Sequence, residues 1–583
     1  ISMSPIFQWG GAAALILSAM APLAYAQDTN THDDDHDDET VMKKVVVSTT
    51  RSGRLAQDEP VKVEVIPQEE IEEKAIMRPG NIATLVNETG GIRVQVTSPA
   101  LGAANVRIQG LFGRYTQILA DGLPLYGGQA SSLGLLQIPP TDLRQVDVIK
   151  GSASSLYGAS ALGGVINLIS RTPSDEYEGE VLVNVTSKNG QDITSYFASP
   201  LTPTVSASVT AGLHHQQNQD LDDDGWIDMA GYERASVRPR IYWQGDSGEN
   251  LYMTFGAMTE QRDAGTMGDA TLPDGSQYPL TQDTKRTDAG FVYDRPLGQV
   301  MNINVRGSAM NQDHEHEFGA VYEVDKHQSY LVESSLSGYS DETAWLVGAA
   351  LQCEKFDSET FPEFNYAYQV PGLFSQLDYE ASDNISMSLS ARADWHSEYG
   401  TQLSPRISLL YRPENWTIRG AYGQGFFAPS PFIEDIDEIG LSRLAPLDDL
   451  EEERASTASL DISYAINSVE TSMTLFASDI DNVTELEEIE DMAGSTNKRV
   501  RIVNALGESE IRGAELLLRY RWRDIKFTGS YLYTDATKES DAGINSIPLA
   551  LTPQHSAGLV VMWEEHGSHL LGFEAYYTGT QHL

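Results

Sequence analysis

Long segments of this chain alternate between apolar and polar residues. From Ile385 to His396, isoleucine, methionine, leucine, alanine and tryptophan occupy the odd positions, and polar residues occupy the even ones. The segment from Thr204 to His214 repeats the pattern. A period of two residues is typical of a β-strand with one apolar and one polar face. Both segments exceed the usual strand of a soluble β-sandwich, about 5–6 residues, and suit a membrane-crossing strand of about 9–11 residues. The pattern from Glu178 onward therefore predicts a transmembrane β-barrel.

The part of the chain before this alternation has shorter elements. Apolar segments that end at glycine-bearing turns predict strands at Val106–Gln109, Thr116–Leu119, Gln145–Ile149 and Val165–Ile169, and Val61–Val65 alternates as a fifth strand. Two segments predict helices, Ile71–Met77 and Asn81–Asn87, separated by Pro79-Gly80. The density of glycine indicates tight turns and close backbone approach. We therefore expect a small α+β domain in front of the barrel.

Five spaced motifs within this domain carry a family resemblance. They are Arg107-Ile108-Gln109-Gly110, Ile118-Leu119-Ala120-Asp121-Gly122, Val146 to Gly151, Leu156-Tyr157-Gly158 and Gly163-Gly164-Val165-Ile166-Asn167. In order and spacing they resemble the plug domain of TonB-dependent outer-membrane receptors, and are most similar to the cobalamin and ferric-siderophore importers. The resemblance implies an all-β transmembrane barrel with an N-terminal α+β plug inside its lumen, in the outer membrane of a Gram-negative bacterium.

The resemblance also implies a division of the chain. The plug is expected at residues 44–173 and the barrel at 174–583. The complete family barrel has about 22 antiparallel strands, and 174–583 is short for that number. The chain also stops at Leu583, just past a turn, without the aromatic-terminated strand that closes the family. We therefore expect the C-terminal strands to be missing, which would leave unpaired backbone groups at the barrel edges.

The N-terminus predicts export and a tether. Residues 1–26 contain an apolar segment and an Ala24-Tyr25-Ala26 cleavage pattern, which indicates a signal peptide with a truncated start. Residues 27–43 are acidic and predict an extended periplasmic tether, whose His32 and His36 are an alternative metal site. The β-branched run that follows can add as a strand to a partner's sheet. By resemblance it is the Ton box that the TonB protein grips, comprising Val45, Val46, Val47, Ser48 and Thr49.

The composition excludes several classes of function. Lys and Arg total 39 against 84 Asp and Glu, so the net charge is −45. A nucleic-acid-binding protein needs the opposite sign. The single cysteine, Cys353, excludes an internal disulfide. No nucleophile–base pair or phosphate-binding glycine loop occurs in a convincing context, so we expect no catalysis. The acidic runs Asp448–Glu453 and Glu485–Asp491, within long polar insertions, are interpreted as loop surface.

Three groups of residues are candidate binding sites. By resemblance, the ligand meets the plug apices, where Arg114, Tyr115, Tyr126 and Gln129 are the expected contacts. The segment DLDDDGWID carries the carboxylates of Asp220, Asp222, Asp224 and Asp228, and such oxygen-rich clusters suit Ca²⁺. A solvated acidic loop is an equally good interpretation. His314 and His316 share one strand face, where they either ligate a metal or line a polar interior, and the second is favoured.

The expected function is TonB-dependent import of a scarce, large nutrient. A ferric siderophore or another iron complex is favoured as the ligand. The alternatives are a cobalamin receptor with calcium-assisted binding, and a plugged receptor with a signalling or adhesion role. A signalling receptor usually carries a folded domain before its Ton box, and only a short segment separates Ala26 from Lys44. The expected partners are TonB, the metal-chelate or cobalamin-like ligand and outer-membrane lipid, with no obligatory cofactor.

Overall fold

The computed structural model describes most of the chain after its N-terminal segment. The described residues are 50–51, 55–77, 82–87, 89–98, 101, 103–125, 138, 140–268, 270–272, 275–433, 440–489, 499–539, 546–565 and 569–582. The expected signal peptide, acidic tether and Ton box lie outside these ranges, as do Tyr126 and Gln129.

The N-terminal domain, which we call the plug, is a small α+β unit. Its four-stranded sheet has the order β1 (Val63–Pro67), β5 (Leu143–Lys150), β6 (Gly164–Ser170) and β4 (Thr116–Ala120). Only β4 and β6 pair in parallel. A separate hairpin joins β2 (Ile92–Ser98) to β3 (Ala103–Ile108). The helices are α1 (Gln68–Met77), α2 (Ala83–Asn87) and α4 (Ser154–Tyr157), with 3-10 turns η2 (Ala56–Asp58), η3 (Gly113–Tyr115), η5 (Pro140–Asp142) and η6 (Ala159–Ala161). All the strands and helices predicted for this domain are present, with ends moved by a few residues.

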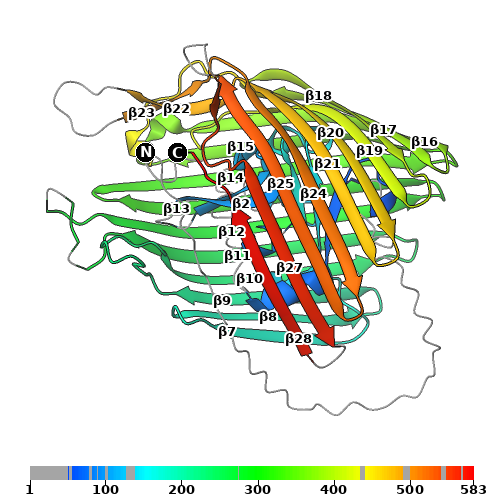
Figure 1. Ribbon diagram of the computed structural model, residues 1–583, viewed down its shortest axis with the longest axis horizontal. Coiled ribbons are helices and arrows are strands. Elements are labelled where there is room, and N and C mark those ends of the chain that lie inside the picture. The colour runs from blue at the N-terminus through cyan, green and yellow to red at the C-terminus, as the bar shows by residue number, and fades with distance from the viewer. Residues whose placement is uncertain are drawn as a thin grey trace.

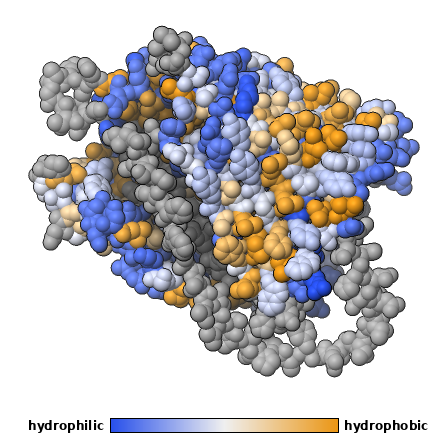
Figure 2. Space-filling model, viewed as in Figure 1, coloured by the Kyte–Doolittle hydropathy of each residue, from blue (hydrophilic) through white to orange (hydrophobic). Residues whose placement is uncertain are grey.

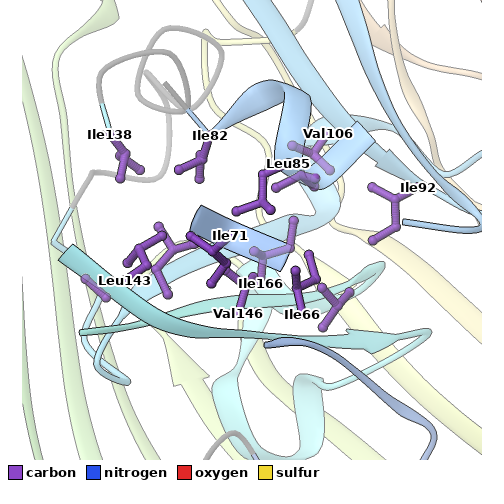
Figure 3. Packing of buried hydrophobic residues seen from close by; sticks show 14 of the residues in the cluster. Ile66, Ile71, Ile82, Leu85, Ile92, Val106, Ile138, Leu143, Val146 and Ile166 are labelled. Atoms are coloured by element: carbon purple, nitrogen blue, oxygen red, sulfur yellow. The ribbon is translucent and has the colours of Figure 1, made fainter. Parts of the chain in front are cut away.

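One apolar cluster holds the plug together. Ile71 of α1 and Leu85 of α2 pack over Val146 and Ile166 of the sheet, and Ile66 closes one side of the cluster (Figure 3). All five side chains are buried. The return from η6 into β6 requires a glycine, because Gly164 has φ 149° and an added Cβ would overlap the carbonyl oxygen of Ile149. The glycine-rich motifs of the sequence therefore serve close backbone approach within the plug.

The rest of the chain forms a barrel wall of long antiparallel strands around the plug (Figure 1). Its strands are β7 (Glu178–Val185), β8 (Gly190–Thr202), β9 (Val205–Gln216), β10 (Gly231–Gln244), β11 (Asn250–Gly265), β12 (Pro279–Leu297), β13 (Met301–Phe318), β14 (Val321–Tyr339), β15 (Thr343–Ser358), β16 (Tyr366–Ser382), β17 (Ile385–His396), β18 (Gly400–Tyr411), β19 (Trp416–Phe427), β20 (Glu453–Ile466), β21 (Val469–Asp481), β24 (Ser509–Trp522), β25 (Ile525–Glu539), β26 (Ser546–Pro548), β27 (His555–Glu565) and β28 (His569–Thr578). The short turns η7 (Pro362–Phe364) and η8 (Leu441–Arg443) lie between strands.

The predicted two-residue period is confirmed in the wall. Along β17, Met387 and Leu389 are exposed, whereas Ser386, Ser388 and Ser390 are buried. Hydrophobic residues gather over the outer face of the front strands, and hydrophilic residues gather toward the ends of the barrel (Figure 2). An apolar outer band between polar ends is what a lipid bilayer requires. No helix within the described ranges combines the length and apolar character needed to cross a membrane.

The described chain supplies twenty strands to this wall, in the order of a closed barrel that places β28 next to β7. Residue-by-residue registers connect the strands from β7 through to β28. No such register joins β28 to β7 among the described residues. The expectation of unpaired edges and of further strands in the complete protein stays a prediction.

The two ends of the barrel differ. Residues 203–204, 245–249, 298–300 and 340–342 form short turns at one end. Longer connections at the other end, which we call the loop end, join β9 to β10, β11 to β12 and β19 to β20. The loop end also carries a hairpin outside the wall, formed by β22 (Thr484–Ile489) and β23 (Arg499–Asn504). In the sequence, the polar segment from Glu260 to Arg286 resembles a long loop, but these two residues belong to β11 and β12 and are buried.

Candidate functional site

Buried ion pairs join the plug to the barrel wall. Lys150 of β5 places Nζ 2.7 Å from Oε1 of Glu515 on β24 and 2.8 Å from Oε1 of Glu64 on β1. The Lys150 and Glu515 side chains are only 2% and 1% exposed. A buried charge is tolerated only with a paired countercharge. The contact therefore fixes the plug sheet against β24.

Further ion pairs connect the plug to other sides of the wall. Lys62 contacts Asp461 of β20 at 2.8 Å. Arg51 contacts Glu333 of β14 at 2.9 Å. Asp142 of η5 pairs with Arg240 of β10. Because these barrel partners lie on strands far apart in the wall, the plug is held from several directions at once.

The pKa of Asp142 reflects its partners. Burial by itself would raise the pKa of this carboxyl group. The charge of Arg240 and a hydrogen bond from the Thr210 hydroxyl act in the opposite direction and prevail, so the pKa lies below its ordinary value of 3.8. Asp142 is therefore a carboxylate at neutral pH and a charged partner of the wall.

Two of the expected ligand contacts, Arg114 and Tyr115, lie together in η3. Arg114 places Nη2 3.2 Å from Oε2 of Glu453, and the Tyr115 hydroxyl donates a hydrogen bond to the same carboxylate. The ring of Tyr115 packs edge-on against Phe427, with ring centroids 5.6 Å apart. Burial raises the pKa of Tyr115 well above its usual range, which keeps the hydroxyl protonated as a donor. The two residues thus tie a plug apex to the start of β20.

Arg114 and Tyr115 are too buried in this structure for a ligand to contact them directly. Tyr115 has no exposed surface, and the Arg114 side chain is 8% exposed. A ligand that reached either group in this state would have to displace the contact with Glu453. Glu453 itself was expected on a solvated loop surface, and this is wrong, because its side chain is fully buried. Its acidic neighbours in the sequence gave no signal that it differs from them.

The acidic loop between β9 and β10 is closed by its own carboxylates. Asp220 accepts hydrogen bonds from the backbone N–H groups of Asp223 and Gly225, at 2.8 and 2.9 Å. Asp224 accepts one from Trp226 at 2.8 Å. The fourth carboxylate, Asp228, accepts a hydrogen bond from the backbone of Leu221 at 2.6 Å. Asp220, Asp222 and Asp224 lie together, whereas Asp228 braces the base of the loop.

Three groups of side chains among the described residues bring potential metal ligand atoms within 4.8 Å of one another. They are Asp220, Asp222 and Asp224; Glu69, Glu73 and Glu564; and His314, His316 and Asp325. The first is the predicted calcium loop, and the second is an acidic cluster between α1 of the plug and β27 of the wall. The third alone contains imidazole, so it suits a different class of metal ion from the other two.

Comparisons with known proteins give a consistent result. A family model described as "TonB dependent receptor-like, beta-barrel" matches residues 157–582. A second, described as "TonB-dependent Receptor Plug Domain", matches residues 56–165. Together the two matches cover the plug and the wall described above.

Three relatives match over nearly the whole chain. The iron-regulated outer membrane virulence protein of Vibrio cholerae is 22% identical over 93% of this chain and 84% of its own length. The ferric enterobactin receptor PirA of Pseudomonas aeruginosa is 22% identical over 96% and 87%. The vitamin B12 transporter BtuB of Photobacterium profundum is 24% identical over 90% and 82%.

A solved structure supports the fold. A crystal structure of a mutant of the ferric enterobactin receptor PfeA from Pseudomonas aeruginosa superimposes with a TM-score of 0.77. It covers 92% of this chain and 88% of that chain at 16% identity. The likeness therefore extends to the arrangement of plug and barrel together.

Proposed function

Because the chain belongs to the TonB-dependent receptor family, we propose that it imports a ferric siderophore or another iron complex across the outer membrane. Two of the relatives described above carry names that refer to iron, and both align over more than nine-tenths of the chain. The ligand binds from the loop end, and the energy comes from TonB on the periplasmic side.

The observation that carries this proposal is the plug, held inside the barrel by buried ion pairs. A wall of this circumference without a plug would leave an open lumen. Here Lys150 and Asp142 attach the plug to opposite parts of the wall, so passage requires work to move or partly unfold the plug. We assign the site where TonB applies that work to Val45, Val46, Val47, Ser48 and Thr49, which lie outside the described residues.

The plug apex at η3 is the proposed ligand sensor. Arg114 and Tyr115 share the carboxylate of Glu453, and that contact bridges plug and wall. An anionic iron complex that drew the guanidinium of Arg114 toward itself would weaken this bridge. Ligand binding at the loop end would thereby loosen the plug on the side that TonB does not reach.

A second candidate ligand is cobalamin, and the acidic loop favours it. The carboxylates of Asp220, Asp222 and Asp224 lie close enough to share one cation at the loop end. We propose Ca²⁺ as that cation, which would order the loop above the lumen. The vitamin B12 transporter among the relatives supports keeping this alternative.

Equilibrium binding to the purified receptor tests the proposal. Ferric catecholate and ferric hydroxamate siderophores, haem and cobalamin would each be titrated in detergent, with calcium and with chelator. The proposal expects saturable binding of an iron complex at or below micromolar concentration. Binding of cobalamin alone would select the alternative, and binding of none of these compounds would contradict both.

A further inference from the structure

The inner face of two neighbouring strands carries a histidine-rich cluster near the loop end. His314 and His316 follow one another on the inward face of β13, and Asp325 lies opposite His314 on β14. His314 Nδ1 is 3.0 Å from Asp325 Oδ1, and His316 Nε2 is 3.3 Å from Asp325 Oδ2. We propose that His314, His316 and Asp325 bind a divalent transition-metal ion, with Zn²⁺ as the reference ion.

The chemistry of the three groups suits this class of metal. Two imidazoles and one carboxylate form a common ligand set for zinc, and three protein ligands leave a fourth position open to water or to a donor atom of another molecule. Imidazole also suits Ni²⁺ and Cu²⁺, whereas Ca²⁺ and Mg²⁺ prefer oxygen ligands. The histidine site is therefore expected to bind transition-metal ions, whereas the loop at Asp220, Asp222 and Asp224 suits Ca²⁺.

The geometry is set by strand pairing. The register pairs His314 with Asp325 and His316 with Glu323, so two carboxylates stand opposite two imidazoles. Rings that are two residues apart on one strand face are held side by side, and those of His314 and His316 have centroids 5.2 Å apart. The ligand atoms lie within 4.8 Å of one another, so small side-chain rotations would bring all three to a shared ion.

Glu323 adds a second negative charge and links the cluster to the loop end. Its carboxylate accepts hydrogen bonds from the backbone N–H groups of Leu441 and Ser442, at 3.2 and 3.0 Å. The connection between β19 and β20 therefore folds over this part of the lumen. A cation beside Asp325 and Glu323 would reduce the repulsion between these two buried carboxylates.

Gln312 provides an independent observation. Its amide Nε2 lies 2.6 Å from His314 Nε2, so it donates there and the ring proton is on Nδ1, facing Asp325. The amide oxygen Oε1 is buried and has no hydrogen-bond partner within the described part of the chain. Turning the amide by half a rotation would let this oxygen accept a hydrogen from Nε2 of His314. The lone pair of Nδ1 would then point at the proposed ion.

Gln312 is thus placed to select between two states of the ring. With the amide N–H toward His314, Asp325 binds the proton of Nδ1. With the amide oxygen toward His314, Nδ1 of the ring becomes a metal ligand and Nε2–H donates a hydrogen bond to the Gln312 oxygen. Metal-ligating histidines usually donate their second N–H to such an acceptor, and its loss typically weakens metal affinity about 10–100-fold.

Zinc calorimetry on the full chain in detergent tests this proposal. The chain would carry His32→Ser and His36→Ser to remove the imidazoles of the tether, and Ca²⁺ would be present to occupy acidic loops. We expect one saturable Zn²⁺ site, which the pair His314→Ala and His316→Ala abolishes. Gln312→Leu, a positioning variant, is expected to weaken zinc binding about 10–100-fold. Gln312→Glu should retain it.

The matched control is His214, which forms an inward-facing pair with Asp192 on adjacent strands, while its neighbour His215 lies on the opposite face of β9. His214→Ala should leave zinc binding unchanged. Cobalt-substituted protein gives a second readout, since its visible absorption reports an ordered site and should disappear in the His314→Ala/His316→Ala variant. Absence of zinc binding by the parent chain at millimolar zinc, or unchanged binding in that variant, would overturn the proposal. Equal loss in His214→Ala would also overturn it.

Discussion

Lys150 of the plug and Glu515 of β24 form a buried ion pair with Nζ and Oε1 2.7 Å apart. Lys150→Met would leave the Glu515 carboxylate buried without its closest cation. Breaking such a pair from one side typically costs about 3–5 kcal/mol. We expect the free energy of plug unfolding to fall by that order, measured by urea titration with pulsed proteolysis of the plug.

Two controls isolate the charge effect. Lys150→Met combined with Glu515→Leu removes both charges of the pair. The Glu64 carboxylate, which also contacts Lys150, keeps Lys62 as a countercharge at 3.9 Å. The double variant should therefore be more stable than Lys150→Met. Lys526→Met breaks the exposed plug–barrel pair with Glu69 and should cost no more than about 1 kcal/mol. Equal stability of the single and double Lys150 variants would exclude charge pairing as the cause.

Asp142 predicts an acid dependence of plug anchoring. Its pKa lies below 3.8 because Arg240 and Thr210 outweigh the effect of burial. The contribution is therefore fully present above the unfolded-state pKa, near 3.8, and is lost as the pH falls through the folded value. Plug stability measured from pH 7 downward should decline in that window. Asp142→Asn should flatten this part of the decline. An unchanged pH profile in this variant would show that Asp142 does not cause the acid dependence of plug stability.

Val46→Pro tests the coupling segment. Proline lacks the backbone N–H that strand addition to TonB requires. Uptake should fail while ligand binding by the purified receptor remains normal. Asn30→Pro, which introduces the same residue into the acidic tether, should support uptake like the parent chain. Normal uptake by Val46→Pro would place the Ton box elsewhere.

The acidic loop predicts a calcium effect on ligand affinity. Asp222→Ala with Asp224→Ala should abolish calcium binding measured by calorimetry, and with it any gain in cobalamin or siderophore affinity. Free Ca²⁺ at 100 times the dissociation constant of the site would stabilise the calcium-bound form by about 2.7 kcal/mol. Asp448→Ala with Asp449→Ala, in another acidic run, should change neither quantity. A parent chain that shows no heat with millimolar Ca²⁺ would leave this loop as surface.

The fold was largely predictable because lipid imposes a simple pattern. Serine alternates with isoleucine, methionine and leucine at the start of β17 so regularly that one face must meet lipid and the other the interior. The prediction failed where inward-facing positions are charged. Glu260 and Arg262 of β11 pair with each other inside the barrel, Oε1 to Nε 2.8 Å, yet in the sequence they resemble a polar loop. Burial of paired charges in a plugged lumen has no local sequence signal.

The site was less predictable for a related reason. Tyr115 and Glu453 are 338 residues apart in the sequence, and only the folded barrel brings them into contact. Glu453 follows several acidic residues that do lie near the surface, so the acidic run predicted a surface position for Glu453 as well. Likewise, the pairing of His314 with Asp325 depends on the register between β13 and β14, which the alternating pattern leaves open. Motifs located the plug, but its contacts with the wall required the structure.

Uptake of radiolabelled ferric siderophore by cells that produce this receptor tests the central claim most directly. The parent chain would be compared with Val46→Pro, and each with and without a functional TonB, in a strain that lacks other receptors for the same compound. The account predicts accumulation of iron only by the parent chain and only with TonB. Accumulation that persists without TonB, or no accumulation of any iron complex that the receptor binds, would contradict it.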